Sequence, residues 1–539
     1  MGKKIGIDLG TTYSCMAYLN ENGALEVIKN FEGSNTTPSI VFFESETNVV
    51  VGEQARSGAL FNPENIVERI KSLMEDKHYT VEKFGTEYSP SAISSLILRK
   101  LKADAENALG EEIEGAVITC PAYFGTIARG ATQKAAEDAG LKVYQIINEP
   151  TAAAFAYAYI KNEDVNKNVL IYDLGGGTFD CTLLRMDFQG DNKKLNVIAS
   201  NGDHTLGGKD WDAAFTNYII NEFCSATGVD NGEVLADAEI MAWFSENVEK
   251  TKKQLSQREM IKVPVNFQGN KHIVEVTRDI FNSITEDLLN KTIDLVNAML
   301  SENSFSVDSI DEIILVGGST RMPQVEKRLT EEYNKPIIQF EPDEAVAKGA
   351  ALMAAYAYSY EEGGASNDGD PLGGAAAPSS EGGAEEDRGF EIKLPGGGSF
   401  VGDDITNKSY GIKVYDPQED KYVVVNIIKK GTTKPCSGTS MEIMPLVVGS
   451  AKSITVCESD YNEDIIDHNS DQDVFTGPLN ITPGLPSDTP VEVVFDINHS
   501  GILEIKTMVA GVETRLVFDP TTGGASTAGS EAAKKLVLS

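Results

Sequence analysis

A glycine-rich stretch at residues 173–180, DLGGGTFD, constrains the fold more than any other part of the chain. An apolar run, residues 169–172, precedes it and a strand-like run, residues 181–188, follows it, so the pattern predicts two strands joined by a tight turn. Successive glycines let backbone N–H groups turn toward an anion without a Cβ in the way. Asp173 would repel a phosphate unless a cation lay between them. The stretch is therefore either a nucleotide-phosphate loop with a divalent metal or an ordinary hairpin between core strands.

A second copy of this pattern favours the phosphate loop. Residues 4–7, KIGI, lead into the loop, residues 8–12 read DLGTT, and residues 13–19 are again strand-like. The segments that begin at Glu149 and at Pro342 also correspond, because each has an acidic start and then small residues that suit close helix packing. Two such pairs predict a duplicated fold that clamps phosphates between its halves.

Composition narrows the class of partner. The 539 residues suffice for three or four compact units, and the net charge of −36 argues against nucleic acid or an anionic membrane surface as a main partner. No uncharged run is long enough to span a bilayer. The six cysteines form no Cys-x-x-Cys pair and no secretion signal is recognisable, so we expect free thiols and a cytoplasmic, monomeric protein.

Two charged residues of the first half have alternative interpretations. Pro63 is predicted to open a helix with apolar residues at helical spacing, and Lys71 on that helix would by itself be a solvated charge. Glu149 follows a buried strand and precedes Pro150 at the start of an alanine-rich helix. It is either a helix cap or a functional carboxylate, since a carboxylate at the end of a buried strand needs a partner.

A later helix carries a polar face. Glu249, Lys252, Lys253 and Ser256 recur at i, i+3, i+4 and i+7 within the helix predicted from Glu239 onward. Such a face is either an exposed, salt-bridged surface or a surface turned toward a ligand, and the spacing alone favours the former.

The composition changes after the first two thirds of the chain. Residues 361–399 are rich in Gly, Ala, Ser and acidic residues, and short strand-like runs separated by turns follow from about residue 404. We therefore divide the chain into a nucleotide-binding domain (1–358), an acidic linker (359–403), a β-sandwich (404–520) and a disordered tail (521–539).

The two loops select among nucleotide-binding folds. Dinucleotide-binding and Walker-type loops run from a strand directly into a helix, whereas both loops here return into strands. This arrangement matches the two-lobed actin-like ATPases, an α/β architecture with a duplicated ribonuclease H-like fold. The predicted fold class is this architecture followed by an all-β sandwich domain.

The chain resembles the heat shock protein 70 family of DnaK-type chaperones. The runs that match the nucleotide-binding domain of that family are residues 5–14, 121–124, 146–154, 173–180, 207–208, 315–321 and 342–349. Residues 404–518 resemble its peptide-binding β-sandwich more weakly, in the runs 404–406, 478–483 and 493–503. The stretch after Phe518 is too short for the helical lid of that family, so we expect a short, lidless form.

The resemblance implies ATP hydrolysis and assigns roles to individual residues. The catalytic set would be Asp8, Lys71, Glu149, Asp173 and Thr178, with Mg²⁺ held by Asp8 and Asp173 mainly through water and with K⁺ as a further candidate ion. The remaining ATP-binding residues would be Gly10, Thr11, Thr12, Tyr13, Gly175, Gly176, Gly177, Gly207, Gly208, Glu249, Lys252, Lys253, Ser256, Gly317, Gly318, Ser319, Arg321 and Asp343. In the β domain, Ile412, Tyr415, Ile454 and Val456 are candidates for an apolar peptide pocket.

Two departures from the family pattern leave the function open. Lys253 stands where the family often has Arg, which would weaken nucleotide binding because Lys lacks the planar guanidinium. The leucine-rich linker that should couple the domains is missing, although Pro121 and Arg129 match family residues of interdomain signalling.

We therefore weigh three functions. The first is an ATP-driven chaperone for unfolded or extended polypeptide, whose partners would include a J-domain co-chaperone and a nucleotide exchange factor. The second is an ATPase or nucleotide-dependent scaffold whose β domain binds one dedicated partner. The third, a small-molecule kinase, is disfavoured by the length of the family match.

Overall fold

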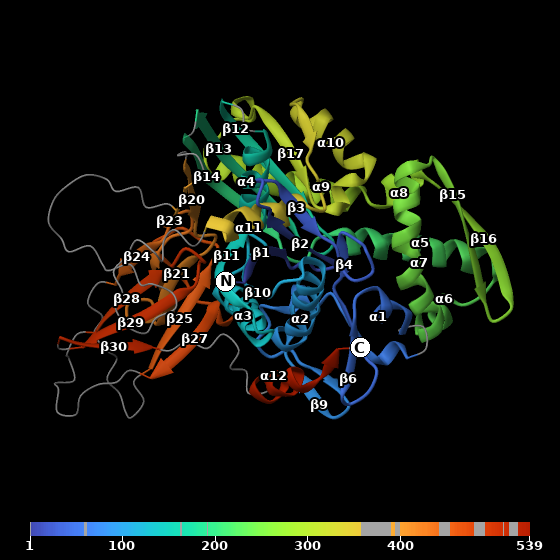
Figure 1. Cartoon of the computed structure of the whole chain (residues 1–539), viewed down its shortest axis with the longest axis horizontal. Helices are drawn as coiled ribbons and strands as arrows, with labels where there is room; N and C mark the ends of the chain where they lie inside the picture. The colour runs from blue at the N-terminus through green and yellow to red at the C-terminus, as the bar shows by residue number, and fades with distance from the viewer. Residues whose placement is uncertain are drawn as a thin grey trace.

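The computed structural model shows a two-lobed α/β body with a β domain beside it (Figure 1). It describes residues 2–58, 62–161, 164–190, 192–356, 390–393, 399–440, 453–478, 491–509, 511–516 and 526–538. None of the described helices combines the length and the apolar character needed to cross a bilayer.

The first lobe contains a central sheet of order β11-β10-β1-β2-β3, with β4 paired to β2, and a smaller sheet of order β31-β6-β5-β7. The strands of the central sheet are β1 (Lys3–Asp8), β2 (Tyr13–Leu19), β3 (Leu25–Ile28), β4 (Thr36–Pro38), β10 (Ile113–Cys120) and β11 (Lys142–Asn148). The other elements are β5 (Ile40–Phe43), β6 (Asn48–Val51), β7 (Ile66–Glu68), β8 (Val81–Lys83), β9 (Thr86–Tyr88), α1 (Glu53–Gly58), α2 (Pro90–Leu109) and α3 (Thr126–Asp138). Local sequence explains the bounds of α2, because Ser89 caps its first turn, Pro90 opens it and Gly110, at φ 68°, ends it.

The second lobe is built on the sheet β18-β17-β12-β13-β14-β20-β19, whose last two strands are β20 (Ser399–Ile405) and β19 (Phe390–Lys393), and β23 (Thr433–Lys434) pairs with β20. The strands that precede residue 357 are β12 (Val165–Leu174), β13 (Phe179–Gln189), β14 (Asn192–Asp203), β17 (Glu312–Val316) and β18 (Ile337–Gln339), and the separate hairpin β15 (Met260–Phe267) and β16 (Asn270–Thr277) lies at the right in Figure 1. The helices are α5 (Gly208–Thr227), α6 (Asn231–Ala236), α7 (Ala238–Gln257), α8 (Arg278–Ile284), α9 (Glu286–Glu302) and α10 (Pro323–Tyr333). Both predicted glycine loops are tight hairpin connections, since Asp8 pairs with Cys15 and Asp173 pairs with Asp180.

Two small-residue helices, α4 (Glu149–Lys161) and α11 (Ala345–Tyr356), pack against each other between the lobes. Their backbones approach so closely that a Cβ at Gly349 would lie 1.8 Å from the carbonyl oxygen of Ala152. A Cβ at Gly6 of β1 would likewise lie 2.0 Å from the backbone nitrogen of Ala351. The correspondence between these two helices, predicted from their acidic starts and small residues, therefore marks the seam of the two lobes.

The helix predicted from Pro63 is wrong. A short 3₁₀ helix (Pro63–Asn65) is followed by strand β7 and a second 3₁₀ helix (Ile70–Leu73). β7 pairs with β5, and Arg69 adopts a left-handed conformation, φ 58°, which a continuous α-helix does not allow. The apolar spacing is real, but pairing with a sheet edge outweighs helical periodicity here.

The β domain is a sandwich of two antiparallel sheets, β26-β22-β21-β25-β27 and β24-β28-β29-β30. Its strands are β21 (Ser409–Asp416), β22 (Lys421–Ile428), β24 (Cys436–Thr439), β25 (Ser453–Ser459), β26 (Ile465–Asp467), β27 (Asp473–Pro478), β28 (Val491–Ile497), β29 (Leu503–Val509) and β30 (Val512–Leu516). β28 and β29 alternate buried and partly exposed residues, as a half-buried antiparallel sheet requires. The predicted sandwich is thus present, with Phe495 fully buried in its core.

The structure corrects both ends of the predicted linker and tail. β19 (Phe390–Lys393) lies within the predicted linker and β20 (Ser399–Ile405) begins in it; both extend the second-lobe sheet, and β23 (Thr433–Lys434) pairs with β20. Residues 359–389 and 394–398 of the predicted linker lie outside the described residues. The tail predicted to be disordered contains helix α12 (Ser526–Lys535) and strand β31 (Val537–Leu538), which pairs with β6. Low-complexity composition gave no signal for β19 and the start of β20, and α12 was missed because its ten residues include no large apolar side chain.

Candidate functional site

A cleft of about 1150 Å³ lies between the two lobes and is lined by both glycine loops. The predicted residues that line it are Asp8, Gly10, Thr11, Thr12, Tyr13, Lys71, Glu149, Asp173, Gly175, Gly176, Thr178, Gly208, Glu249, Lys252, Lys253, Ser256, Gly317, Gly318, Ser319, Arg321 and Asp343. The fold thus brings together residues from both halves of the first 358 positions.

Two predicted residues, Gly177 and Gly207, do not line the cleft. A Cβ at Gly207 would lie 2.5 Å from the backbone of Gly177, so these glycines permit one loop to pack on the other. The two phosphate-type loops also touch across the lobes, since a Cβ at Gly176 would lie 2.0 Å from Thr12 Oγ1. Glycine is required at these positions for close backbone approach.

Carboxylates gather at the base of the cleft. Asp8 and Asp173 stand at the ends of β1 and β12, and Asp8 accepts a hydrogen bond from Thr119 Oγ1 at 3.2 Å. Burial, and then the nearby charge of Glu149, raise the pKa of Asp8 to about 7 and raise the pKa of Asp173 well above its ordinary value. Burial and Glu149 also raise the pKa of Asp180 to about 7.

Lys71 is the buried cation that faces these acids. Its side chain is 4% exposed and its Nζ lies 2.5 Å from Glu149 Oε1, so the interpretation of Lys71 as a solvated charge is wrong. Burial lowers the pKa of Lys71, but Glu149 and Asp8 outweigh it and leave that pKa raised. Glu149, in turn, is a buried, paired carboxylate as well as the first residue of α4.

The donor set fits a magnesium ion. Lys71 supplies one positive charge against the three carboxyl groups of Asp8, Glu149 and Asp173, so acidic groups outnumber basic groups at the base of the cleft. Excess buried charge of this kind is costly unless a cation compensates it. Carboxylate oxygens with room for water are the ligands that Mg²⁺ prefers.

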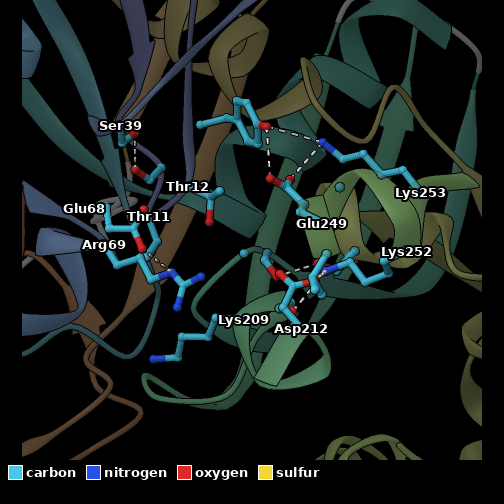
Figure 2. Close-up of a pocket in the computed structure, with 18 of the residues that line it drawn as sticks. Thr11, Thr12, Ser39, Glu68, Arg69, Lys209, Asp212, Glu249, Lys252 and Lys253 are labelled. Atoms are coloured by element: carbon cyan, nitrogen blue, oxygen red, sulfur yellow. Dashed lines mark hydrogen bonds and ion pairs between the residues drawn. The ribbon is translucent and has the colours of Figure 1, made fainter. Parts of the chain in front are cut away.

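The polar face of α7 turns toward the cleft, so the interpretation as an exposed surface is wrong, although the face is salt-bridged. Figure 2 shows Lys253 reaching Glu249, with Nζ to Oε1 2.8 Å, and Lys252 reaching Asp212 at 2.7 Å. Lys253 Nζ also lies 3.4 Å from the hydroxyl of Tyr13, which belongs to the other lobe. These contacts join the two walls of the cleft.

The turn after β17 closes the same end of the cleft. Ser319 Oγ donates to the carbonyl oxygen of Gly175 at 2.9 Å, and Arg321 forms an ion pair with Asp343 at 2.5 Å. Side chains of Arg321 and Asp343 are 55% and 42% exposed, so both remain accessible to a ligand. The predicted residues of this turn therefore form one cluster.

Sequence reasoning missed several residues of the cleft. Arg56 on α1 lies 3.5 Å from Glu249 across the lobes, and Ser39 Oγ donates to the carbonyl oxygen of Gly10 at 2.7 Å. Arg69 and Lys209 are cations that project into the cleft (Figure 2). Lys209 directly follows the Gly207-Gly208 turn, which is the one sequence signal that could have found it.

A buried polar network leads from the cleft to the β domain. Arg129 donates to Asn148 Oδ1 at 2.5 Å and to the carbonyl oxygen of Ser500 at 3.2 Å. Asn148, the neighbour of Glu149, donates to both carboxylate oxygens of Asp404, which also pairs with Lys434 at 2.9 Å. The first-lobe residues beside the cleft and the β domain thus share one hydrogen-bonded cluster.

A second route connects the glycine loop itself with the β domain. The backbone N–H of Tyr123 donates to Asp180 Oδ1 at 3.2 Å, and the Tyr123 hydroxyl donates to Asp460 Oδ2 at 2.7 Å. Lys408 pairs with Asp460 at 3.0 Å and lies over the Tyr123 ring. The domains are therefore docked through specific polar contacts.

The predicted peptide pocket does not form at the proposed residues. Ile412, Ile454 and Val456 are buried in the core between the two sheets of the sandwich, at 1%, 7% and 0% exposure. Tyr415 lies outside that core and its hydroxyl donates to Asp420. Strand alternation places the three aliphatic residues inward, where they stabilise the sandwich rather than contact a ligand.

The fold and the cleft define an actin-like nucleotide-binding protein with two lobes and an attached β domain. The family model described as Hsp70 protein matches residues 4–361, which is more than half of the chain. The chain therefore belongs to the Hsp70 family, whose members are nucleotide-dependent chaperones and ATPases that use ATP or ADP with Mg²⁺.

Proposed function

We propose that this chain is a DnaK-type chaperone that hydrolyses ATP in the interlobe cleft and binds extended polypeptide through its β domain. The observation that carries the proposal is the buried Lys71–Glu149 ion pair beside Asp8 and Asp173, between the two glycine loops. A structural core would not retain one lysine among several buried acids, whereas a phosphoryl-transfer site uses both charges.

In this proposal, different residues of the cleft bind the phosphates, bind adenosine and act on the attacking water. Thr11, Thr12 and the N–H groups of the 173–180 loop donate to phosphate oxygens, and α7 with the turn at 317–321 holds the adenosine end. Lys71 contacts the terminal phosphate and orients the attacking water, while Glu149 accepts a hydrogen bond from that water. Asp8 and Asp173 would hold Mg²⁺ mainly through water, and the ion would neutralise charge on the phosphate oxygens. The rate gain comes from position and electrostatics, because little covalent chemistry falls to the protein.

The docked β domain supports communication between the two activities. Asn148, the residue next to Glu149, donates to Asp404, and Tyr123 joins Asp180 with Asp460. A change in the cleft therefore reaches the β domain through two sets of hydrogen bonds. Unfolded polypeptide, a J-domain co-chaperone and a nucleotide exchange factor are the partners we propose, for a monomer in the cytoplasm.

The test is the steady-state rate of phosphate release from ATP with Mg²⁺, measured with and without an extended apolar peptide. We expect Mg²⁺-dependent turnover that rises when the peptide binds. A chain that binds ATP but never releases phosphate, with peptide or without it, would contradict the enzymatic part of the proposal. Transfer of the γ-phosphate to a small-molecule acceptor would instead support a kinase.

A dedicated partner is the second candidate function. The burial of Ile412, Ile454 and Val456 in the sandwich core favours it, since these residues do not form an apolar pocket on the surface. Affinity capture from a lysate separates the candidates, because a chaperone retains many unfolded chains and a scaffold retains one partner in stoichiometric amount.

A further inference from the structure

Residues 526–538 lie against the first lobe and not against the β domain from which the chain has just emerged. α12 contacts α2 and β9, and β31 pairs in parallel with β6. Figure 1 shows α12, in red, below α2 and beside β6 and β9, apart from the strands of the sandwich. The chain thus returns to the nucleotide-binding domain after completing the sandwich.

The apolar side of this segment is part of the first-lobe core. Ala533 is 0% exposed and Leu536 is 6% exposed, and both join the core that contains Leu101 and Ala105 of α2. A Cβ at Gly529 would lie 2.3 Å from the carbonyl oxygen of Glu87 in β9. Helix α12 is therefore seated as closely as a buried helix of the domain.

A first-lobe arginine hydrogen-bonds to the backbone carbonyl groups at the C-terminal end of α12. Arg99 donates to the carbonyl oxygens of Ala533, Lys534 and Leu536 at 3.0, 3.2 and 2.6 Å. Carbonyls of the last helical turn lack intrahelical partners, so Arg99 acts as their cap. Arg99 belongs to α2 of the first lobe. Its three hydrogen bonds require α12 to end beside α2, as it does here.

A backbone pairing and an ion pair complete the contact. The backbone N–H of Val537 donates to the carbonyl oxygen of Thr47 at 2.8 Å, and β31 continues along β6. Lys534 lies 3.1 Å from Asp138 Oδ1, whose side chain is 3% exposed. Burial would raise the pKa of Asp138, but hydrogen bonds from Lys134 and Lys534 keep that pKa below its ordinary value.

The β domain is consequently attached at both of its ends. β20 pairs with β14 of the second lobe before the sandwich begins, and residues 526–538 bind the first lobe after it ends. A second linked attachment makes rebinding of the β domain an intramolecular event at high effective concentration.

We propose that residues 526–538 are an intramolecular clamp, which occupies the groove formed by α2, β6 and β9 and retains the β domain in its docked position. The clamp acts on domain docking and not on the cleft, because none of the cleft-lining residues belongs to this segment. It biases the molecule toward the docked arrangement in every nucleotide state, and release of the clamp frees the β domain to separate.

The first test measures docking by hydrogen exchange of the backbone amides of β20, which pair with β14 of the second lobe in this structure and which the proposal expects to open more often when the clamp is released. We expect Leu536→Asp to raise the exchange rate of β20 by on the order of 10²-fold, the lower end of the gain from a linked attachment. Val537→Asp is the matched control, because Val537 is 59% exposed and its backbone pairing survives the change. Equal β20 protection in the two variants would overturn the clamp.

The second test asks whether the groove recognises the segment. A chain that ends at residue 525 is mixed with a labelled synthetic peptide of residues 526–539, and binding is followed by fluorescence anisotropy. Binding of this peptide, and none of the same peptide with Leu536→Asp, supports the groove. Retained ATP binding by the shortened chain shows that it is folded, so absence of peptide binding by that chain would refute the proposal.

Discussion

Lys71 Nζ donates to Glu149 Oε1 at 2.5 Å across 78 residues of sequence, and both side chains are buried. Lys71 lies on a 3₁₀ helix beside the small sheet, whereas Glu149 begins α4 at the end of the central sheet. The pair exists because two sheets of one lobe end at the same cleft. Beside Asp8 and Asp173, it compensates only part of the buried negative charge.

We expect Lys71→Ala to lower the rate of ATP hydrolysis by about 10²–10³-fold while ATP binding persists, since the lysine acts on charge that develops during the reaction. Phosphate release measures the first quantity and isothermal titration measures the second. Lys262→Ala is the control, because Lys262 is exposed and pairs with Glu275 on the outer hairpin. Undiminished turnover in Lys71→Ala would remove this residue from the mechanism.

Lys253→Arg should increase the affinity for ATP by several-fold. Lys253 already reaches Glu249 and the Tyr13 hydroxyl, and its ammonium lies 4.7 Å from the centre of the Tyr13 ring. A guanidinium keeps both contacts and adds a planar surface that can stack on the nucleotide base. This stacking should improve the free energy of ATP binding by roughly 0.5–1 kcal/mol at a partly exposed site. Equilibrium dialysis of ATP against the two proteins gives the ratio, and weaker binding by the arginine variant would contradict the expectation.

Asp404→Asn should lower the free energy of unfolding by about 3–5 kcal/mol, because it leaves the buried Lys434 ammonium without its ion-pair partner. Denaturant unfolding measures the loss. The double change Asp404→Asn with Lys434→Met should recover much of it, since no buried charge is then left unpaired. A double variant as unstable as Asp404→Asn alone would show that the ion pair is not the cause.

The contribution of Lys434 to stability also depends on pH. Burial lowers the pKa of Lys434 below its ordinary value of 10.5, even though Asp404 acts in the opposite direction. The unfolded chain then binds this proton more tightly than the folded chain, so the contribution of Lys434 to stability rises with pH up to 10.5. The contribution of Lys434 is isolated by measuring the free energy of unfolding of the wild type and of Lys434→Met at several pH values. As the pH increases, the free energy of unfolding of the wild type should rise relative to that of the variant.

Gly349→Ala should destabilise the protein by about 1–3 kcal/mol, because the added methyl group meets the carbonyl oxygen of Ala152 at 1.8 Å. In an exposed helix the same change would stabilise by roughly 0.8–1 kcal/mol. A lower melting temperature therefore indicates a close helix crossing at Gly349, whereas a higher one indicates an ordinary exposed helical position. A rise in the melting temperature would contradict the packing of α4 on α11.

The cleft was predictable from sequence to a large degree, and the connections around it were not. The glycine loops carry short-range signals, since their turns depend on residues that are consecutive in the chain. Lys71 and Arg56 have no such signal, because a single lysine or arginine in a polar stretch looks the same in the sequence whether it faces solvent or a cluster of carboxylates. The resemblance implies a peptide pocket at Ile412 and Val456, and strand alternation alone could not correct it, because an inward position looks the same in a core and in a groove.

By itself, the sequence determined the two phosphate-type hairpins, the small-residue helices at the seam and the all-β character of the last third, since each depends on local backbone preference and periodicity. Only the tertiary structure decided that Lys71 pairs with Glu149, that β20 joins the second-lobe sheet, and that residues 526–538 return to the first lobe. These features come from contacts between segments far apart in the chain. These contacts are stabilised by burial and hydrogen bonds between residues that are distant in sequence, so a short stretch of sequence does not reveal them.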